Sequence, residues 1–199
     1  MQHLSDTDLA ATASATGDDK AFAILVKRHQ GRLRAFLRRL GANASLADDI
    51  AQDAFLKAYA AISSFRGGGS FRSWLCAIAY REFLQARRKA GAAARIEDAL
   101  KAETDVTGGG DTAQAAGLSL DLRKALARLE EKERAALILC DAMGLSHSEA
   151  ATALAAPLGS VKTYIARARE KMRAALAPAG DMQAPPLSEP QKDGITHAG

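Results

Sequence analysis

The 199-residue chain is poor in cysteine and histidine, and it has no long apolar run. Its two cysteines, Cys76 and Cys140, lie far apart inside apolar segments, so we expect small reduced core residues rather than a disulfide. The four histidines form no cluster with metal-ligand spacing, which argues against a metal site. No stretch approaches the roughly 18 apolar residues of a membrane span, and the N-terminus lacks the features of a signal peptide. We therefore expect a cytoplasmic protein that is not embedded in a membrane.

Catalytic patterns are also missing. The sequence offers no nucleophile–base pair, phosphate-binding loop or metal cluster, so we expect neither an enzyme, nor a cofactor, nor a small-molecule substrate. The net charge of +4 is unevenly distributed, with six Lys/Arg and no acid in Lys27–Arg39, and five Lys/Arg in Lys162–Arg173. Between these segments, Glu97–Asp111 holds five acids and one lysine. Basic ends around an acidic middle suggest two modules that face a polyanion, although solvated basic helix faces are common.

The periodic segments have the helical repeat, and no alternating strand pattern persists. We predict an all-α fold of two small helical domains joined by a flexible linker. The predicted division is an N-terminal segment at 1–17, a first domain at 18–92, an acidic linker at 93–117, a second domain at 118–177 and a disordered tail at 178–199.

Helix boundaries follow from capping residues and chain breakers. Gly41 ends a first helix, and Ser45 with Asp48 three residues later forms a capping-box start for a second. A third helix is predicted at 71–89, after the loop 65–70, whose consecutive glycines cannot sustain a helix.

A helix-turn-helix pattern occupies residues 144–176. Ser146 caps a short helix, the segment 155–160 breaks it, and a second helix begins at Ser160 or Val161.

The second helix of this pattern combines an apolar stripe with a basic face. The stripe is formed by Val161, Ile165, Ala168 and Met172. The exposed face is formed by Lys162, Arg169 and Arg173, with Thr163 and Arg167 beside it. Such a helix can enter a major groove, where Lys and Arg contact phosphates and guanine edges. A solvated basic face is the alternative, and the contrast with the charge-poor first helix favours DNA binding.

The segments Gly144–Ser146, Glu149–Ala151, Pro157–Thr163 and Arg167–Arg169 resemble the signature of region four of extracytoplasmic-function (ECF) sigma factors. In that family the domain reads the minus-thirty-five promoter element and contacts the polymerase flap. The resulting DNA-binding assignment comprises Ser160, Lys162, Thr163, Tyr164, Arg167, Arg169 and Arg173. Glu130 stands where the family usually has proline, so we expect the helices on either side of it to be less sharply separated. Tyr164 stands where the family often has arginine, so the base preference of the family is not carried over to this position.

A second candidate binding surface lies on the predicted second helix, where one apolar side chain is surrounded by side chains that accept hydrogen bonds. This face is formed by Asp49, Gln52, Asp53 and Leu56. It suits docking to a basic helix with a hydrophobic anchor, although a charged face with one incidental leucine is the simpler interpretation without further information. The surrounding segment Ala47–Lys57 resembles sigma region two, which binds the clamp helices of the largest polymerase subunit. The resemblance therefore implies polymerase binding by this face.

The segments Phe65–Gly67 and Phe71–Leu75 are similar to the promoter-melting segment of the same family. Melting needs a substitute for lost base stacking, which aromatic and basic side chains can supply. The minus-ten and melting assignment comprises Phe65, Arg66, Arg72, Trp74, Arg81, Arg87 and Arg88. These aromatic rings can also fill a core; for Trp74 we favour the core, with the glycine loop as the base pocket. Arg81 stands where the family usually has asparagine, which predicts an atypical minus-ten preference.

Together the two matches imply an alternative sigma factor that binds core RNA polymerase, directs promoter-specific initiation and is controlled by an anti-sigma factor. Two alternatives compete with this interpretation. One is a sigma mimic that sequesters an anti-sigma protein without binding promoters, and the basic face of 162–173 argues against it. The other is a helix-turn-helix regulator that works without polymerase, which would leave the face at 49–56 unexplained.

Overall fold

The structure is a computed structural model that describes residues 3–67, 69–101 and 120–177. Within these residues all regular structure is helical, which confirms the predicted fold class. The elements are α1 (Asp6–Thr16), α2 (Asp19–Leu40), α3 (Ala44–Ala60), the 3₁₀ turn η1 (Ile62–Ser64), α4 (Phe71–Lys101), α5 (Leu120–Ala127), α6 (Glu131–Leu137), the π-helical turn η2 (Ile138–Ala142), α7 (His147–Leu154) and α8 (Leu158–Leu176). The predicted tail, and the predicted linker beyond residue 101, lie outside the described residues.

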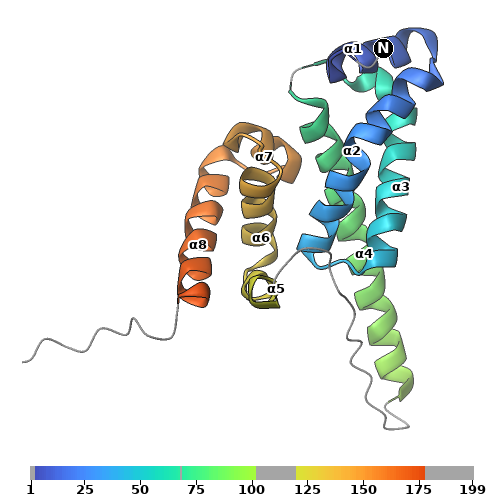
Figure 1. Cartoon of the computed structure of the whole chain (residues 1–199). Coiled ribbons are helices and arrows are strands. Elements are labelled where there is room, and N and C mark those ends of the chain that lie inside the picture. The colour runs from blue at the N-terminus through green and yellow to red at the C-terminus, as the bar shows by residue number, and fades with distance from the viewer. Residues whose placement is uncertain (1–2, 68, 102–119, 178–199) are drawn as a thin grey trace, which may run out of the picture.

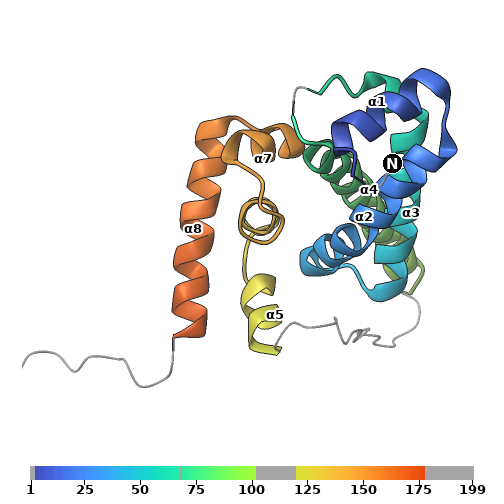
Figure 2. The same cartoon turned by 45° about the horizontal axis from the view of Figure 1, so that its top comes forward.

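The helices form two lobes, as Figures 1 and 2 show. Helices α1–α4 make the first lobe and α5–α8 make the second, so the two predicted helical domains are confirmed. The lobes are in contact, because α7 packs against α4, and η2 and α6 pack against α2. Buried side chains of both lobes belong to one connected apolar cluster. The described lobes are therefore packed together, and not held only by the chain between them.

Helix α3 begins differently from the prediction. The Asn43 side chain caps it by accepting a hydrogen bond from the Leu46 N–H at 2.8 Å. The predicted capping box of Ser45 and Asp48 is wrong, since Asp48 instead forms an ion pair with Arg34 of α2 at 2.8 Å. A tertiary contact between two helices thus competes with the local capping signal.

Helix α2 ends at Gly41 as predicted, with a φ of 113° that favours glycine. Helix α4, however, continues to Lys101, well past the predicted end at Lys89 and into the predicted linker. Its continuation is rich in alanine, the strongest helix former, and Gly91 costs only about 1 kcal/mol in a helix interior, which does not end the helix.

The second lobe differs from the prediction in two places. Helices α5 and α6 are clearly separated, contrary to the expectation that Glu130 would blur their boundary. Glu130 has an extended backbone, and its N–H donates a hydrogen bond to the Glu133 carboxylate at 3.2 Å. Ser146 caps α7 as predicted, but α8 begins at Leu158, ahead of the predicted Ser160 or Val161. Ala155, with a φ of 48°, makes the turn between these helices.

The cysteines are both free in the structure. Cys76 is a core residue as predicted, and burial raises the pKa of its thiol to about 12. Cys140 is only half-buried. Among the described residues, no group of three metal-ligating side chains is arranged to hold a metal ion, and no helix is long and apolar enough to cross a bilayer.

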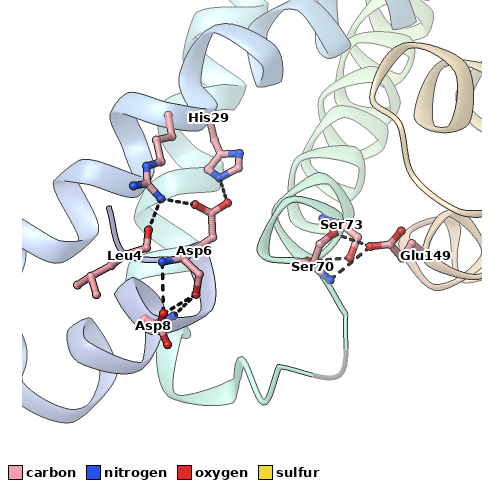
Figure 3. A network of polar contacts seen from close by, with 9 residues as sticks. Leu4, Asp6, Asp8, His29, Ser70, Ser73 and Glu149 are labelled. Carbon is pink, nitrogen blue, oxygen red and sulfur yellow. Dashed lines mark hydrogen bonds and ion pairs between the residues drawn. The ribbon is translucent and has the colours of Figure 1, made fainter. Parts of the chain in front are cut away.

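Helix α1 lies in the segment 1–17, where no helix is predicted from the sequence. A capping box of Ser5 and Asp8 begins it, and the Asp6 carboxylate ties it to α2. Asp6 accepts hydrogen bonds from Arg28 at 2.8 Å and from His29 Nε2 at 2.7 Å (Figure 3). Burial acts to raise the pKa of Asp6, but the bonds from Arg28 and His29 outweigh it and hold the pKa below its usual value of 3.8.

Replacing Asp6 with asparagine should lower the free energy of unfolding by about 1–2 kcal/mol at neutral pH, because hydrogen bonds to a charged acceptor are lost. Since the folded-state pKa is lowered, the wild-type advantage should be present above the unfolded value of 3.8 and disappear as the pH falls through the folded value. Urea denaturation at several pH values measures this. Asp53→Asn, on the exposed face of α3, is the control, and equal losses in both variants would contradict the assignment.

Candidate nucleic-acid interface

Helix α8 separates apolar and basic side chains as the sequence predicts. Val161, Ile165 and Ala168 are buried, and Met172 is half-buried against the core. The predicted DNA-contacting side chains on the outside are Lys162, Thr163, Arg167, Arg169 and Arg173, all exposed, whereas Ser160 and Tyr164 are half-buried. The structure thus brings most of the predicted minus-thirty-five set onto one exposed helix.

Two carboxylates fix α8 to the rest of the second lobe. Lys171 forms an ion pair at 2.7 Å with Glu133, whose side chain is only 2% exposed. Arg169 donates two hydrogen bonds to Asp141, at 2.7 and 3.2 Å. Neither acid can be recognised from local sequence patterns, because they lie 28 and 38 residues from their partners. Any phosphate contact by Arg169 must share its guanidinium with Asp141.

Tyr164 lies near Tyr80 of α4 in the other lobe. Burial raises the pKa of Tyr80 to about 12, and the charges of Glu131 and Tyr164 add to the effect while Arg87 opposes it. Tyr164 is therefore close to the junction between the lobes, and the structure does not place it with the exposed basic side chains.

An aromatic cluster occupies the predicted melting segment. Phe71 is buried, while Phe65 and Trp74 are half-buried with their ring centroids 5.4 Å apart. Phe71 contacts both, at 5.6 Å from Phe65 and 5.7 Å from Trp74. Trp74 packs against the core, as favoured, yet it also lines an open cleft.

This cleft has a volume of about 390 Å³ and lies between the lobes. The first lobe lines it with Phe65, Arg66, Trp74 and Arg81, all predicted minus-ten residues. The second lobe lines it with Ser148, Glu149 and Thr152. Aromatic faces beside two guanidinium groups suit a base and its backbone phosphates.

The remaining three predicted minus-ten residues lie outside the cleft lining. Arg72 lies against the second lobe, with Nη1 only 3.8 Å from where a Cβ on Gly144 would stand. Arg87 forms an ion pair with Glu131 at 2.5 Å. Arg88 is exposed on α4.

The predicted polymerase-binding face lies on α3. Its members Asp49, Gln52 and Asp53 are exposed, and Leu56 is 61% exposed, which is unusual for a large apolar side chain. A groove of about 600 Å³ between α2 and α3 adjoins this face. Its apolar lining includes Phe22, Val26, Phe55 and Tyr59, beside Gln52 and Leu56. Helical periodicity assigns Phe22 and Val26 to a core stripe, so only the packing of α2 on α3 reveals their part in the groove.

The second lobe has an apolar groove of its own, about 890 Å³ in volume. Leu126 and Ile138 line it together with Met172 and Leu176 near the end of α8. Arg39 of α2 also borders it.

Comparisons with known proteins agree with this arrangement. Residues 25–93 match the Sigma-70 region 2 family, and residues 119–172 match Sigma-70 region 4. The RNA polymerase sigma factor NccH of Alcaligenes xylosoxydans xylosoxydans is 37% identical over 182 residues, which cover 88% of this chain and 97% of NccH. The ECF RNA polymerase sigma-E factor of Escherichia coli K12 is 35% identical over 165 residues, covering 77% of this chain and 85% of that protein.

A solved structure shares the fold. The sigma factor RpoE of Bartonella quintana, crystallised with the anti-sigma factor NepR, superposes with a TM-score of 0.66 at 31% identity, covering 79% of this chain and 97% of RpoE. The helical lobes, the helix-turn-helix and these relatives define a bacterial transcription initiation factor and not an enzyme. The chain belongs to the sigma-70 family of RNA polymerase sigma factors, in its ECF group.

Replacing Lys171 with methionine should destabilise the second lobe by about 2–3 kcal/mol, because the Glu133 carboxylate stays buried without its cation. The effect is below that of a wholly buried pair, since Lys171 is 43% exposed. Thermal unfolding followed by circular dichroism measures it. Lys162→Met, on the exposed face of α8, is the matched control, and an equal loss in the two variants would refute the role of the pair.

Proposed function

We propose that this chain binds core RNA polymerase in the bacterial cytoplasm and directs it to promoters through two DNA-reading surfaces, one on each lobe. The observation that carries this proposal is the pairing of a basic recognition helix on α8 with an aromatic and arginine-lined cleft beside α4. Neither surface contains catalytic chemistry, and both suit a polyanion.

The proposed polymerase contact is the face of α3. Asp49 and Asp53 supply negative charge for a basic partner helix, Gln52 supplies polar contacts, and Leu56 supplies an apolar anchor beside the groove. An apolar anchor of this kind can be buried in a pocket of the partner while the residues around it exclude water. The clamp helices of the largest subunit are the partner that the family resemblance implies.

The proposed minus-ten reader is the cleft. Unstacking one base costs a few kcal/mol, and an aromatic contact returns about 1–3 kcal/mol, so Phe65 and Trp74 can offset much of the cost. Arg66 and Arg81 can hold the backbone phosphates of the opened strand, and Arg81 can also contact guanine.

The proposed minus-thirty-five reader is the exposed side of α8. Lys162 and Arg167 form no ion pair within the part of the chain that the structure describes, so both are available to phosphates or base edges. The apolar groove near Met172 and Leu176 is the surface we assign to the polymerase flap.

An anti-sigma factor is the proposed regulator. RpoE of Bartonella quintana was solved in complex with one, and its chain covers most of this sequence. The two apolar grooves of this chain, on α2–α3 and on the second lobe, offer surfaces that such a partner could cover.

Exchanging Gln52 for alanine and Asp53 for lysine should weaken binding to core polymerase by about tenfold or more, because a like charge then faces the basic partner. DNA binding by the second lobe should be unchanged. Affinity for purified core enzyme measures the effect, and Asp121→Lys on α5 makes the same change in net charge away from α3. Unchanged core affinity in the α3 variant would refute the clamp assignment.

Replacing Arg167 with alanine should weaken promoter binding uniformly across sequences if it contacts phosphate, and should reduce the slope of log affinity against log salt by about 1. Fluorescence anisotropy with polymerase holoenzyme and a promoter fragment at several salt concentrations measures the slope. Lys124→Ala, an exposed lysine on α5, should leave the slope unaltered. A slope that stays the same in the Arg167 variant as well would place this side of α8 away from DNA.

A further inference from the structure

His29 is a buried polar side chain on α2, and the other buried residues of that helix are apolar. It is only 6% exposed. Its Nε2 atom donates a hydrogen bond to Asp6 at the start of α1, at 2.7 Å (Figure 3). Its ring lies against Phe71, the first residue of α4, with the ring centroids 5.4 Å apart. One imidazole therefore connects α1 on one side with α4 on the other.

Phe71 extends this connection to the cleft between the lobes. It is only 1% exposed, and its ring contacts both Phe65 and Trp74, with centroids 5.6 and 5.7 Å away. Phe65 and Trp74 are the aromatic residues that line the cleft, and His29 stands behind them. Ring contacts thus lead from the junction of α1 and α2 to the surface that we assign to the unpaired base.

Helix α1 also contacts the glycine loop at 65–70 more directly. It packs on η1, which precedes this loop, and on α4, which follows it. Thr7 of α1 lies beside Gly67, since a Cβ placed on Gly67 would stand 3.8 Å from Cγ2 of Thr7. The position of α1 is therefore linked both to the loop and, through His29, to the aromatic cluster.

A buried imidazole lowers stability unless its polar atoms are hydrogen-bonded. An apolar side chain would fill the same place without that cost, as Leu25 and Leu33 do one helical turn away on either side. The bond to Asp6 and the contact with Phe71 act on opposite sides of the ring and hold it in one orientation. Side chains held in place in advance need not be ordered when a ligand binds, which favours binding.

We propose that His29 is a positioning residue for promoter melting, which holds Phe71, and through it Phe65 and Trp74, in the arrangement that receives the unpaired base. This inference rests on the proposed function, because it takes the cleft as the minus-ten reader. His29 makes no contact with DNA in this scheme and acts only through Phe71. Helix α1 supports it through Asp6.

The test compares substitutions at both ends of the Asp6–His29 bond. His29→Leu removes the donor and the ring, while Arg28 remains paired with Asp6 at 2.8 Å, so the carboxylate keeps a cationic partner. His29→Gln keeps an N–H donor for Asp6. Asp6→Ala removes the acceptor without altering the buried position on α2. Ser14→Ala, at an exposed position on α1, is the control, and circular dichroism checks that each variant folds.

Trp74 is the single tryptophan of the chain, so the intrinsic fluorescence of the free full-length protein reports on the cluster. We expect His29→Leu and Asp6→Ala to shift the emission maximum, and His29→Gln to shift it less. Because Asp6 acts through His29, the shift in the double variant of His29→Leu and Asp6→Ala should be smaller than the sum of the two single shifts. Ser14→Ala should emit like the wild type.

The second measurement is the affinity of the polymerase holoenzyme for single-stranded DNA. The probe is a labelled oligonucleotide with the nontemplate minus-ten sequence of a promoter mapped by transcription in vitro. His29→Leu should weaken its binding about tenfold, which is comparable with the loss of one hydrogen bond to a charged group, and His29→Gln should weaken it less. Affinity for core polymerase should keep its wild-type value, whereas a general loss of folded structure would lower both affinities.

Failure of the positioning role and failure of the proposed function give different results. Wild-type emission in both His29→Leu and Asp6→Ala would overturn the positioning role, whether or not the chain supports transcription. So would equal losses of affinity for the oligonucleotide and for core polymerase, or a His29→Gln variant no better than His29→Leu. A shifted emission with unchanged affinity for the oligonucleotide would show that His29 orders the cluster but that the cluster is not the minus-ten reader, so the proposed function of the cleft would be wrong.

Discussion

The packing of α7 against the N-terminal part of α4 is the contact around which the described structure is arranged. Helix α4 carries Phe71 and Trp74 of the aromatic cluster and most of the arginines assigned to minus-ten DNA, and the second lobe packs against it. The Ser70–Glu149 hydrogen bond and the cleft both lie at this contact. The two surfaces proposed to read DNA therefore lie on lobes that pack against each other.

The division into two lobes explains why each DNA-reading surface can be modest. In the proposal, Lys162 and Arg167 make a few phosphate contacts, and the aromatic side chains of the cleft stack against an unpaired base. When polymerase holds both lobes over one promoter, the second contact becomes intramolecular and its effective concentration rises. Affinity of the whole can then far exceed that of either surface, and it depends on the lobes reaching the correct separation.

The sequence predicts the local features of this fold well, because their signals lie within a few residues. Gly41 ends α2, Ser146 caps α7, and the stripe from Val161 to Ala168 is buried. The exposed side chains of α3 and α8 follow from helical periodicity alone. Their roles come from the family resemblance, since an exposed charged face is compatible with many functions.

Contacts between residues that are far apart in the chain cannot be predicted from local sequence patterns. Ser70 and Glu149 are 79 residues apart, and Leu40 and Arg134 are 94 apart, so no spacing rule connects them. Glu149 was recognisable from sequence only as part of the helix-turn-helix signature. The start of α3 illustrates the same limit, because Asp48 is used by Arg34 of a neighbouring helix and Asn43 provides the cap.

This chain directs RNA polymerase to the positions at which transcription begins. Transcription in vitro by purified bacterial core enzyme on fragments of genomic DNA, with the 5′ ends of the products sequenced, tests it most directly. The account predicts that adding the chain produces RNA beginning at a defined set of positions that share upstream sequences about 10 and 35 base pairs away, consistent with one reader on each lobe. Products that begin at the same scattered positions with and without the chain would contradict it.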